Sequence, residues 1–116
     1  MDLPVLKKSR ATSKSKVTRL KKNILKEVEE RVLESTVRNH LSELKLAWEG
    51  VQSLHEQYVN QLPEGEDEEE EQWISTAFDE YKSTEVFVQK YLFDIGKEQA
   101  KAIENEEQEA QRDAES

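Results

Sequence analysis

The sequence predicts an all-α protein with a long antiparallel, coiled-coil-like helical hairpin and an additional basic helix at the N-terminus, either beside the hairpin or packed with it as a three-helix bundle. Only three Gly and two Pro residues occur among 116, so few positions favour turns. Large apolar residues recur at spacings of three and four along two long stretches, as on one face of a helix. With 37% charged and 34% apolar residues, the chain can form one small domain with a limited core.

The N-terminal part is expected to change character at about residue 13. Residues 1–12 mix a proline and hydroxyl residues with cations and show no sustained period, which predicts a flexible basic arm. Beyond them, apolar residues recur at spacings of three or four, namely Val17, Leu20, Ile24 and Val28. This stripe predicts an amphipathic first helix over about residues 13–33.

A second helix is predicted over about residues 36–62. Because the stripe of the first helix does not continue in register, we expect a turn just before it, with Ser35 or Thr36 as the N-cap; one long bent helix is the alternative. The heptad seam of the second helix consists of Val37, Leu41, Leu44, Trp48, Val51, His55, Tyr58 and Leu62. Such a seam indicates packing along a partner helix. Gly50 is expected on the outer side.

A third helix is predicted over about residues 67–104, after a turn at Pro63 and Gly65. We interpret the acidic run over residues 64–71 as the first helical turn, which favours carboxylates, in preference to a cation site. The third helix has its own seam, interrupted at Glu85 and formed by Ile74, Phe78, Tyr81, Val88, Leu92 and Ile95. A short turn between helices of similar length predicts an antiparallel hairpin, whose core is the two seams without His55 and Glu85.

The third helix has more apolar surface than one partner helix would cover. Phe87 and Tyr91 lie off its seam and form a candidate interaction face, which either the first helix or a second copy of the chain would cover. After Gly96 the residues are mostly Glu, Gln, Ala and Lys, with Ile103 as the large apolar exception. We therefore expect helix to about residue 104 and an acidic, fraying tail over residues 105–116.

Charge is distributed unevenly along the chain. Residues 1–26 hold nine Lys or Arg against one acid, a net charge of +8, whereas residues 27–116 hold eight against twenty-five, a net charge of −17. The candidate polyanion-binding residues are Lys7, Lys8, Arg10, Lys14, Lys16, Arg19, Lys21, Lys22 and Lys26. They form either a solvated helix face that pairs with the acidic body or a contact to RNA or an acidic membrane. Without an aromatic residue among them, RNA binding would be weakly sequence-selective.

No pattern indicates catalysis, a metal site or a cofactor. The chain has no Cys, and its two histidines, His40 and His55, would lie about 22 Å apart on one helix, so they cannot share a metal. His55 is expected as a hydrogen-bonded core or boundary residue. No phosphate-binding loop or nucleophile motif occurs, so we expect a non-enzymatic protein without a small-molecule substrate. No apolar run reaches the ~20 residues of a membrane span and no signal peptide is recognised, which predicts an intracellular, cytoplasmic protein.

Three stretches of the sequence occur in an order that is familiar from one protein family. They are a basic entry, KSKVTRLKKNI, with Lys16, Thr18, Arg19 and Leu20; a helix, HLSELKLAWEGVQSLHEQY, with Leu41, Leu44, Trp48, Val51, Leu54 and Tyr58; and, after an acidic turn, WISTAFDEYKS, with Phe78, Tyr81 and Lys82. Over about residues 13–92 this order resembles the N-terminal Gag-like helical region of Pao/BEL long-terminal-repeat retrotransposon polyproteins. The resemblance implies a structural, non-enzymatic role at the head of a polyprotein, in particle assembly.

These observations lead to one main functional hypothesis and two alternatives. The main hypothesis is an assembly module that associates with itself or docks on another helical protein through its helical surfaces. One alternative is an electrostatic tether to RNA or a membrane through residues 1–26. The other is a host coiled-coil adaptor that binds another helical protein.

Overall fold

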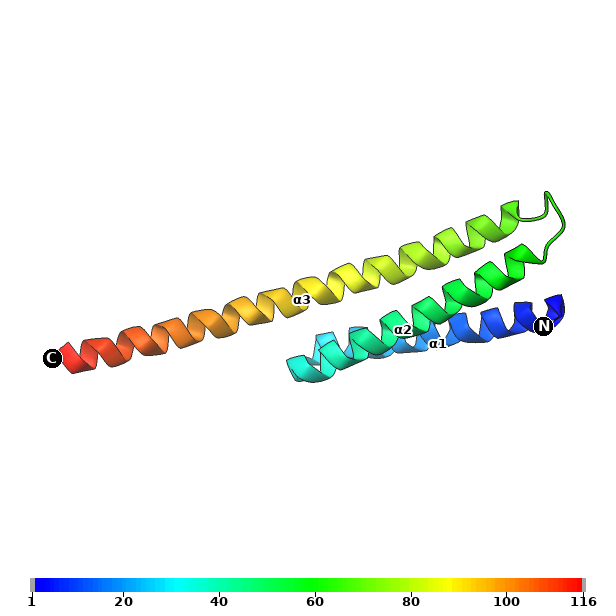
Figure 1. Ribbon diagram of the computed structural model, residues 1–116. Coiled ribbons are helices and arrows are strands. Elements are labelled where there is room, and N and C mark those ends of the chain that lie inside the picture. The colour runs from blue at the N-terminus through cyan, green and yellow to red at the C-terminus, as the bar shows by residue number, and fades with distance from the viewer. Residues whose placement is uncertain (1, 116) are drawn as a thin grey trace.

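Three α-helices make up the computed structural model, which describes residues 2–115 and the side chains of residues 2–106. They are α1 (Leu3–Glu30), α2 (Glu34–Asn60) and α3 (Glu68–Glu115), and the described residues contain no strand. The helices form an elongated bundle of 80 × 20 × 19 Å, in which α3 extends past the other two (Figure 1). The prediction of an all-α fold with three helices is confirmed.

α1 begins at Leu3, so the prediction of a flexible arm over residues 1–12 is wrong. Pro4 lies in the first turn, where its fixed φ suits the helix and its missing N–H removes no helical hydrogen bond. Leu6 and Arg10 are buried, with 0% and 4% of their surface exposed. Their burial in the bundle explains why a stretch of mostly polar residues is helical.

α1 ends in a tight turn at Arg31. This residue has the left-handed conformation, with φ 54° and ψ 47°. The N–H of Arg31 donates to the carbonyl of Val28 (3.2 Å), and the N–H of Val32 donates to the carbonyl of Glu27 (3.0 Å). These bonds satisfy carbonyls at the end of α1 in the manner of a Schellman motif, in which glycine is the usual left-handed residue.

α2 begins at Glu34, slightly earlier than predicted. Its N-cap is Leu33, whose side chain makes no capping hydrogen bond. Ser35 and Thr36 therefore lie inside the helix, and the prediction that one of them is the N-cap is wrong.

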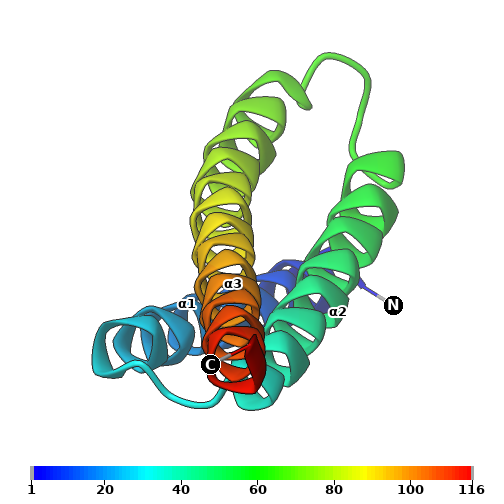
Figure 2. The same ribbon diagram turned by 90° about the vertical axis from the view of Figure 1, so that its left-hand side faces the viewer.

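The most extensive helix–helix contact is between α1 and α2. Gly50 of α2 faces α1 and does not lie on the outer side as predicted, because a Cβ added there would lie 3.6 Å from Ser13 Oγ. Between α2 and α3, the rings of Trp48 and Tyr81 stack with centroids 5.1 Å apart, and these bulky rings keep the two helices further apart. The prediction that α3 is the main partner of α2 is therefore corrected. Seen along the bundle, the three helices lie at the corners of a triangle (Figure 2).

One apolar core joins the three helices, and its buried members are Val17, Ile24, Val28, Val37, Leu44, Trp48, Val51, Ala77, Tyr81, Val88 and Leu92. Of the remaining residues of the predicted hairpin core, Tyr58 is buried, and four are half-buried, namely Leu41, Leu62, Ile74 and Ile95. Phe78 is 42% exposed, so its prediction as a core residue is wrong. Its ring touches the edge of the core, with its centroid 6.0 Å from that of Trp48.

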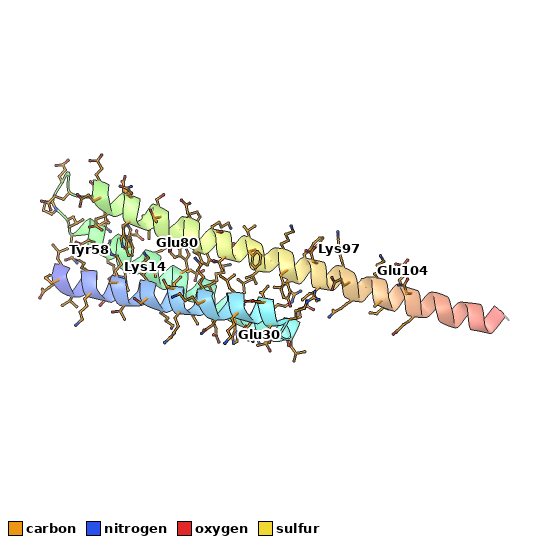
Figure 3. All side chains as sticks on the ribbon, turned by 180° about the vertical axis from the view of Figure 1, so that it is seen from behind. Lys14, Glu30, Tyr58, Glu80, Lys97 and Glu104 are labelled. Carbon is orange, nitrogen blue, oxygen red and sulfur yellow. The ribbon has the colours of Figure 1, made fainter. Side chains whose placement is uncertain are left out.

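α3 continues far beyond the α1–α2 turn. Its first turn consists of the four glutamates at residues 68–71, so the interpretation of the acidic run as a helix start is confirmed for these residues. Glu64, Glu66 and Asp67 lie in the turn before the helix. Near the α1–α2 turn, Arg31 Nη2 lies 3.6 Å from Glu98 Oε2, and from there to residue 106 every side chain is exposed. Glu104 lies on this extension (Figure 3). The backbone is helical to Glu115, so α3 continues past residue 104, where the prediction ended the helix and began the acidic tail over residues 105–116.

Candidate functional site

All three helices meet around the side chain of Arg10, near the turn between α2 and α3. Its Nη1 lies 2.7 Å from Glu70 Oε2 on α3 and 3.0 Å from His55 Nδ1 on α2. Its guanidinium carbon lies 4.0 Å from the centroid of the Trp73 ring and 4.5 Å from that of Tyr58. We call these five residues the Arg10 cage. A cation between two aromatic faces is held by their quadrupoles, and the carboxylate balances its charge.

His55 supports the cage as a neutral acceptor. An arginine can only donate, so His55 Nδ1 accepts the hydrogen bond from Arg10 and its proton is on Nε2. Burial, followed by the nearby Arg10 charge, lowers the pKa of His55. The imidazole also stacks on Trp73, with centroids 5.7 Å apart and ring planes 11° apart. His55 is thus hydrogen-bonded at the boundary of the core.

The sequence contained a signal for Arg10 that our prediction missed. When the apolar stripe of α1 is extended backwards from Val17 at heptad spacing, it reaches Ser13, Arg10, Leu6 and Leu3. An arginine at such a position lies on the buried face of a helix. Arg10 was predicted as a polyanion-binding residue, but its side chain is only 5% exposed and is paired with Glu70, so that prediction is wrong.

The other eight candidate polyanion-binding residues lie mostly on the solvent side of α1. Lys14 and Lys21 are half-buried, and Lys14 Nζ lies 5.3 Å from the centroid of Trp73. Six residues at spacings of four and three form an exposed row that we call the outer stripe: Lys8, Thr12, Ser15, Arg19, Lys22 and Lys26. Lys7 and Lys16 are exposed beside it. In the described contacts, only Arg10 among the nine cations pairs with an acid of another helix.

α3 carries more exposed large apolar side chains than α1 or α2. Phe78, Val86 and Phe93 are 42%, 53% and 62% exposed, and we call them the apolar flank. Their spacings of eight and seven residues place them on one side of the helix over about 22 Å. Phe93 lines an open groove of about 550 Å³ together with Leu41 of α2. Phe78 and Phe93 therefore border the contact with α2, and Val86 lies between them along α3.

The two residues of the predicted interaction face have different environments. Tyr91 is half-buried against the core. Phe87 is 52% exposed and lines a separate open groove of about 580 Å³ between α1 and α3, with Lys21 and Leu25 on the other side. α1 thus covers part of the predicted face, and the Phe87 ring stays largely open to solvent.

Glu85, the polar interruption of the α3 seam, accepts two hydrogen bonds. Tyr81 Oη donates to its Oε2, and Lys82 Nζ donates to its Oε1 at 2.7 Å. The hydrogen bonds from Lys82 and Tyr81 lower the pKa of Glu85, whereas burial and the Glu85 carboxylate raise the pKa of Tyr81. The buried Tyr81 hydroxyl thus has a hydrogen-bond acceptor, which explains why the carboxylate of Glu85 occupies a position of the α3 seam.

Within the described residues, no group of three or more His, Asp or Glu side chains could hold a metal ion. In the same part of the chain, no helix combines the length and apolar character that a membrane span needs. Comparisons with protein-family models, curated proteins and solved structures found no match to this chain.

Proposed function

We propose that this chain is a non-enzymatic helical assembly module that associates with a second copy through the apolar flank of α3. The observation that carries the proposal is the exposure of Phe78, Val86 and Phe93, each by 42% or more, on the part of α3 that packs beside α1 and α2. Burying large apolar side chains is the main favourable contribution to association. Because only three side chains are involved, the association is weak and depends on concentration.

The resemblance to the Gag-like region of Pao/BEL retrotransposon polyproteins supports the same proposal. The stretch that carries it, about residues 13–92, includes most of α1, all of α2 and the part of α3 that holds two of the three flank residues. We propose membership of this family as the context in which such an assembly module would act.

Light scattering behind size exclusion tests the proposal. The mass of the wild-type chain is expected to rise from monomer towards dimer as the concentration approaches several hundred micromolar. Val86→Ser and Phe93→Ser should keep the chain monomeric. Leu46→Ser is the matched control, since Leu46 is 67% exposed on α2 and is not part of the flank. A wild-type chain that stays monomeric throughout contradicts the proposal.

The outer stripe of α1 supports a second candidate function, electrostatic binding of RNA. Its four cations are exposed and lie on one face over about 27 Å, where they can contact successive phosphates. The log of the affinity for single-stranded RNA is then expected to fall with log salt by about 0.7 per phosphate contacted.

Charge reversal tests this candidate better than deletion, because α1 contributes to the core. Arg19→Glu with Lys22→Glu should abolish RNA binding. Lys90→Glu with Lys101→Glu changes the net charge equally on exposed positions of α3 and should preserve it. Equal loss in both variants would mean that only net charge matters. Binding to anionic vesicles but not to RNA would favour the membrane alternative.

A further inference from the structure

We propose that α1 exchanges between two copies of the chain, so that α1 of one copy docks on α2 and α3 of the other. In the exchanged form, the turn at residues 31–33 opens and α1 continues into α2 as one long helix. The partner is therefore a second copy of this chain. The proposal goes beyond association through the apolar flank, because it uses a different surface and does not depend on that flank.

The turn between α1 and α2 is strained at Arg31. Its φ of 54° is a left-handed conformation, which is unfavourable for any residue with a Cβ. Of the positive-φ residues in the described chain, Gly65 in the α2–α3 turn is a glycine and Arg31 is not. Straightening the turn into a helix would remove this strain. Short, strained connections favour exchange of an element between copies.

The turn also lacks the usual signals that end or begin a helix. Residues 31–34 read Arg-Val-Leu-Glu, without glycine or proline, and Arg, Leu and Glu are good helix formers. Leu33 is the N-cap of α2, but it makes no side-chain capping bond and is 75% exposed. In an open, helical connection, hydrogen bonds of the continuous helix would replace the two backbone hydrogen bonds that the turn makes at Arg31 and Val32.

The surface that receives α1 recognises it in one register. In the Arg10 cage, Glu70 and His55 bind the guanidinium of Arg10, which also lies against the rings of Trp73 and Tyr58. Further along α1, Ser13 lies against Gly50, where an added Cβ would be 3.6 Å from Ser13 Oγ. These contacts are the same whether α1 comes from the same copy or from a second copy. The turn at residues 31–33, which we call the hinge, and the protein concentration thus decide whether α1 docks on its own copy or on a second copy.

Disulfide trapping distinguishes the two forms directly. The natural chain has no cysteine, and a Cβ at residue 50 would lie 3.6 Å from Ser13 Oγ, close to what a disulfide requires. One chain carries Ser13→Cys and a mass tag, and another carries Gly50→Cys; they are mixed at high concentration, equilibrated and then oxidised. The expected product is a covalent heterodimer linked between positions 13 and 50, identified by peptide mapping. Absence of this linkage at several hundred micromolar overturns the proposal.

Substitutions at the hinge test its role. Arg31→Gly relieves the left-handed strain and disfavours a continuous helix, so it should reduce the cross-linked fraction by about five- to thirtyfold per hinge. Arg31→Ala is the matched control, since it also removes the ion pair with Glu98 but keeps a Cβ, and it should cross-link as well as the wild-type hinge. Deleting Leu33 shortens the turn and should increase the cross-linked fraction. Equal cross-linking of the Gly and Ala variants overturns the hinge assignment.

The same samples separate this proposal from the proposed function. Dimers that form by light scattering without the 13–50 linkage contradict exchange of α1 but agree with association through the apolar flank. A 13–50 linkage that persists in Phe93→Ser supports exchange of α1 independently of the flank. A monomer without any linkage contradicts both.

Discussion

The guanidinium carbon of Arg10 lies 4.0 Å from the centroid of the Trp73 ring, so a cation of α1 rests on an aromatic face of α3. The same guanidinium pairs with Glu70, whose side chain is 17% exposed. The contact ties α1 to α3 at the end of the bundle where α1 begins and where the α2–α3 turn lies (Figure 1). It is therefore a direct link between α1 and the hairpin of α2 and α3.

Replacing Arg10 by methionine should destabilise the protein by about 2–3 kcal/mol, between the values for surface and fully buried ion pairs. Methionine keeps an apolar stem in place but leaves Glu70 without its partner and Trp73 without its cation. The free energy of unfolding is measured by urea denaturation. Arg19→Met, at an exposed position of the same helix, serves as the control and should change it by less than about 0.5 kcal/mol. Equal effects of the two substitutions would contradict a structural role for the cage.

His55 should make stability depend on pH. In the folded protein, burial, followed by the Arg10 charge, lowers the pKa of His55 below its ordinary value of 6.5. The unfolded chain therefore binds a proton at a higher pH than the folded chain, and protonation favours unfolding. The stabilising contribution of neutral His55 is complete above about pH 6.5 and is lost as the pH falls from there through the folded pKa.

The variant His55→Gln isolates this contribution, because its amide oxygen can accept the hydrogen bond from Arg10 but does not titrate. Urea denaturation of both proteins between about pH 7.5 and pH 5 should show the wild type losing more stability than the variant as the pH falls. Other titrating groups are common to both proteins and cancel in the comparison. A wild type that gains stability relative to the variant on acidification would contradict the sign of the pKa change.

Periodicity predicted the interior of the helices well, because each seam residue is buried by whichever helix lies opposite. Val37, Leu44, Val51 and Val88 are fully buried, as their spacing indicated. The pattern does not say which helix is the partner. α1 makes the most extensive contact with α2 and lies against it at Gly50, and a glycine adds no apolar signal to the pattern.

The surfaces were harder to predict because single polar residues can lie on buried faces. Arg10 continues the heptad pattern of α1, but its charge places it among the surface cations when residue type alone is considered. Phe78 shows the reverse case, since it lies on a seam position yet is 42% exposed, on the side of α3 that α2 does not fully cover. Both outcomes depend on how three helices are arranged, which a single-helix pattern does not contain.

Replacing Gly50 of α2 and Gly65 of the α2–α3 turn by alanine should change the stability of the protein in opposite directions. Gly50→Ala is expected to stabilise the protein by about 1 kcal/mol, since alanine favours the helix and its methyl group would lie at ordinary contact distance, 3.6 Å, from Ser13 Oγ. Gly65→Ala should instead destabilise it by about 1 kcal/mol, because Gly65 has a φ of 92° that alanine disfavours. Urea denaturation measures both. A destabilising Gly50→Ala would mean that α1 and α2 pack more closely at this point.

Truncation after Gln99 should leave the bundle intact. All side chains from residue 96 to residue 106 are exposed, and Ile103, the large apolar residue among them, is 58% exposed, so this length of α3 buries little surface. The free energy of unfolding should change by less than about 0.5 kcal/mol, the usual effect of changes at exposed positions. Circular dichroism should show a loss of helical signal, because α3 is helical well beyond the cut. A marked loss of stability would show that the extension packs against the bundle or against a second copy, and light scattering of the truncated chain would distinguish these two contacts.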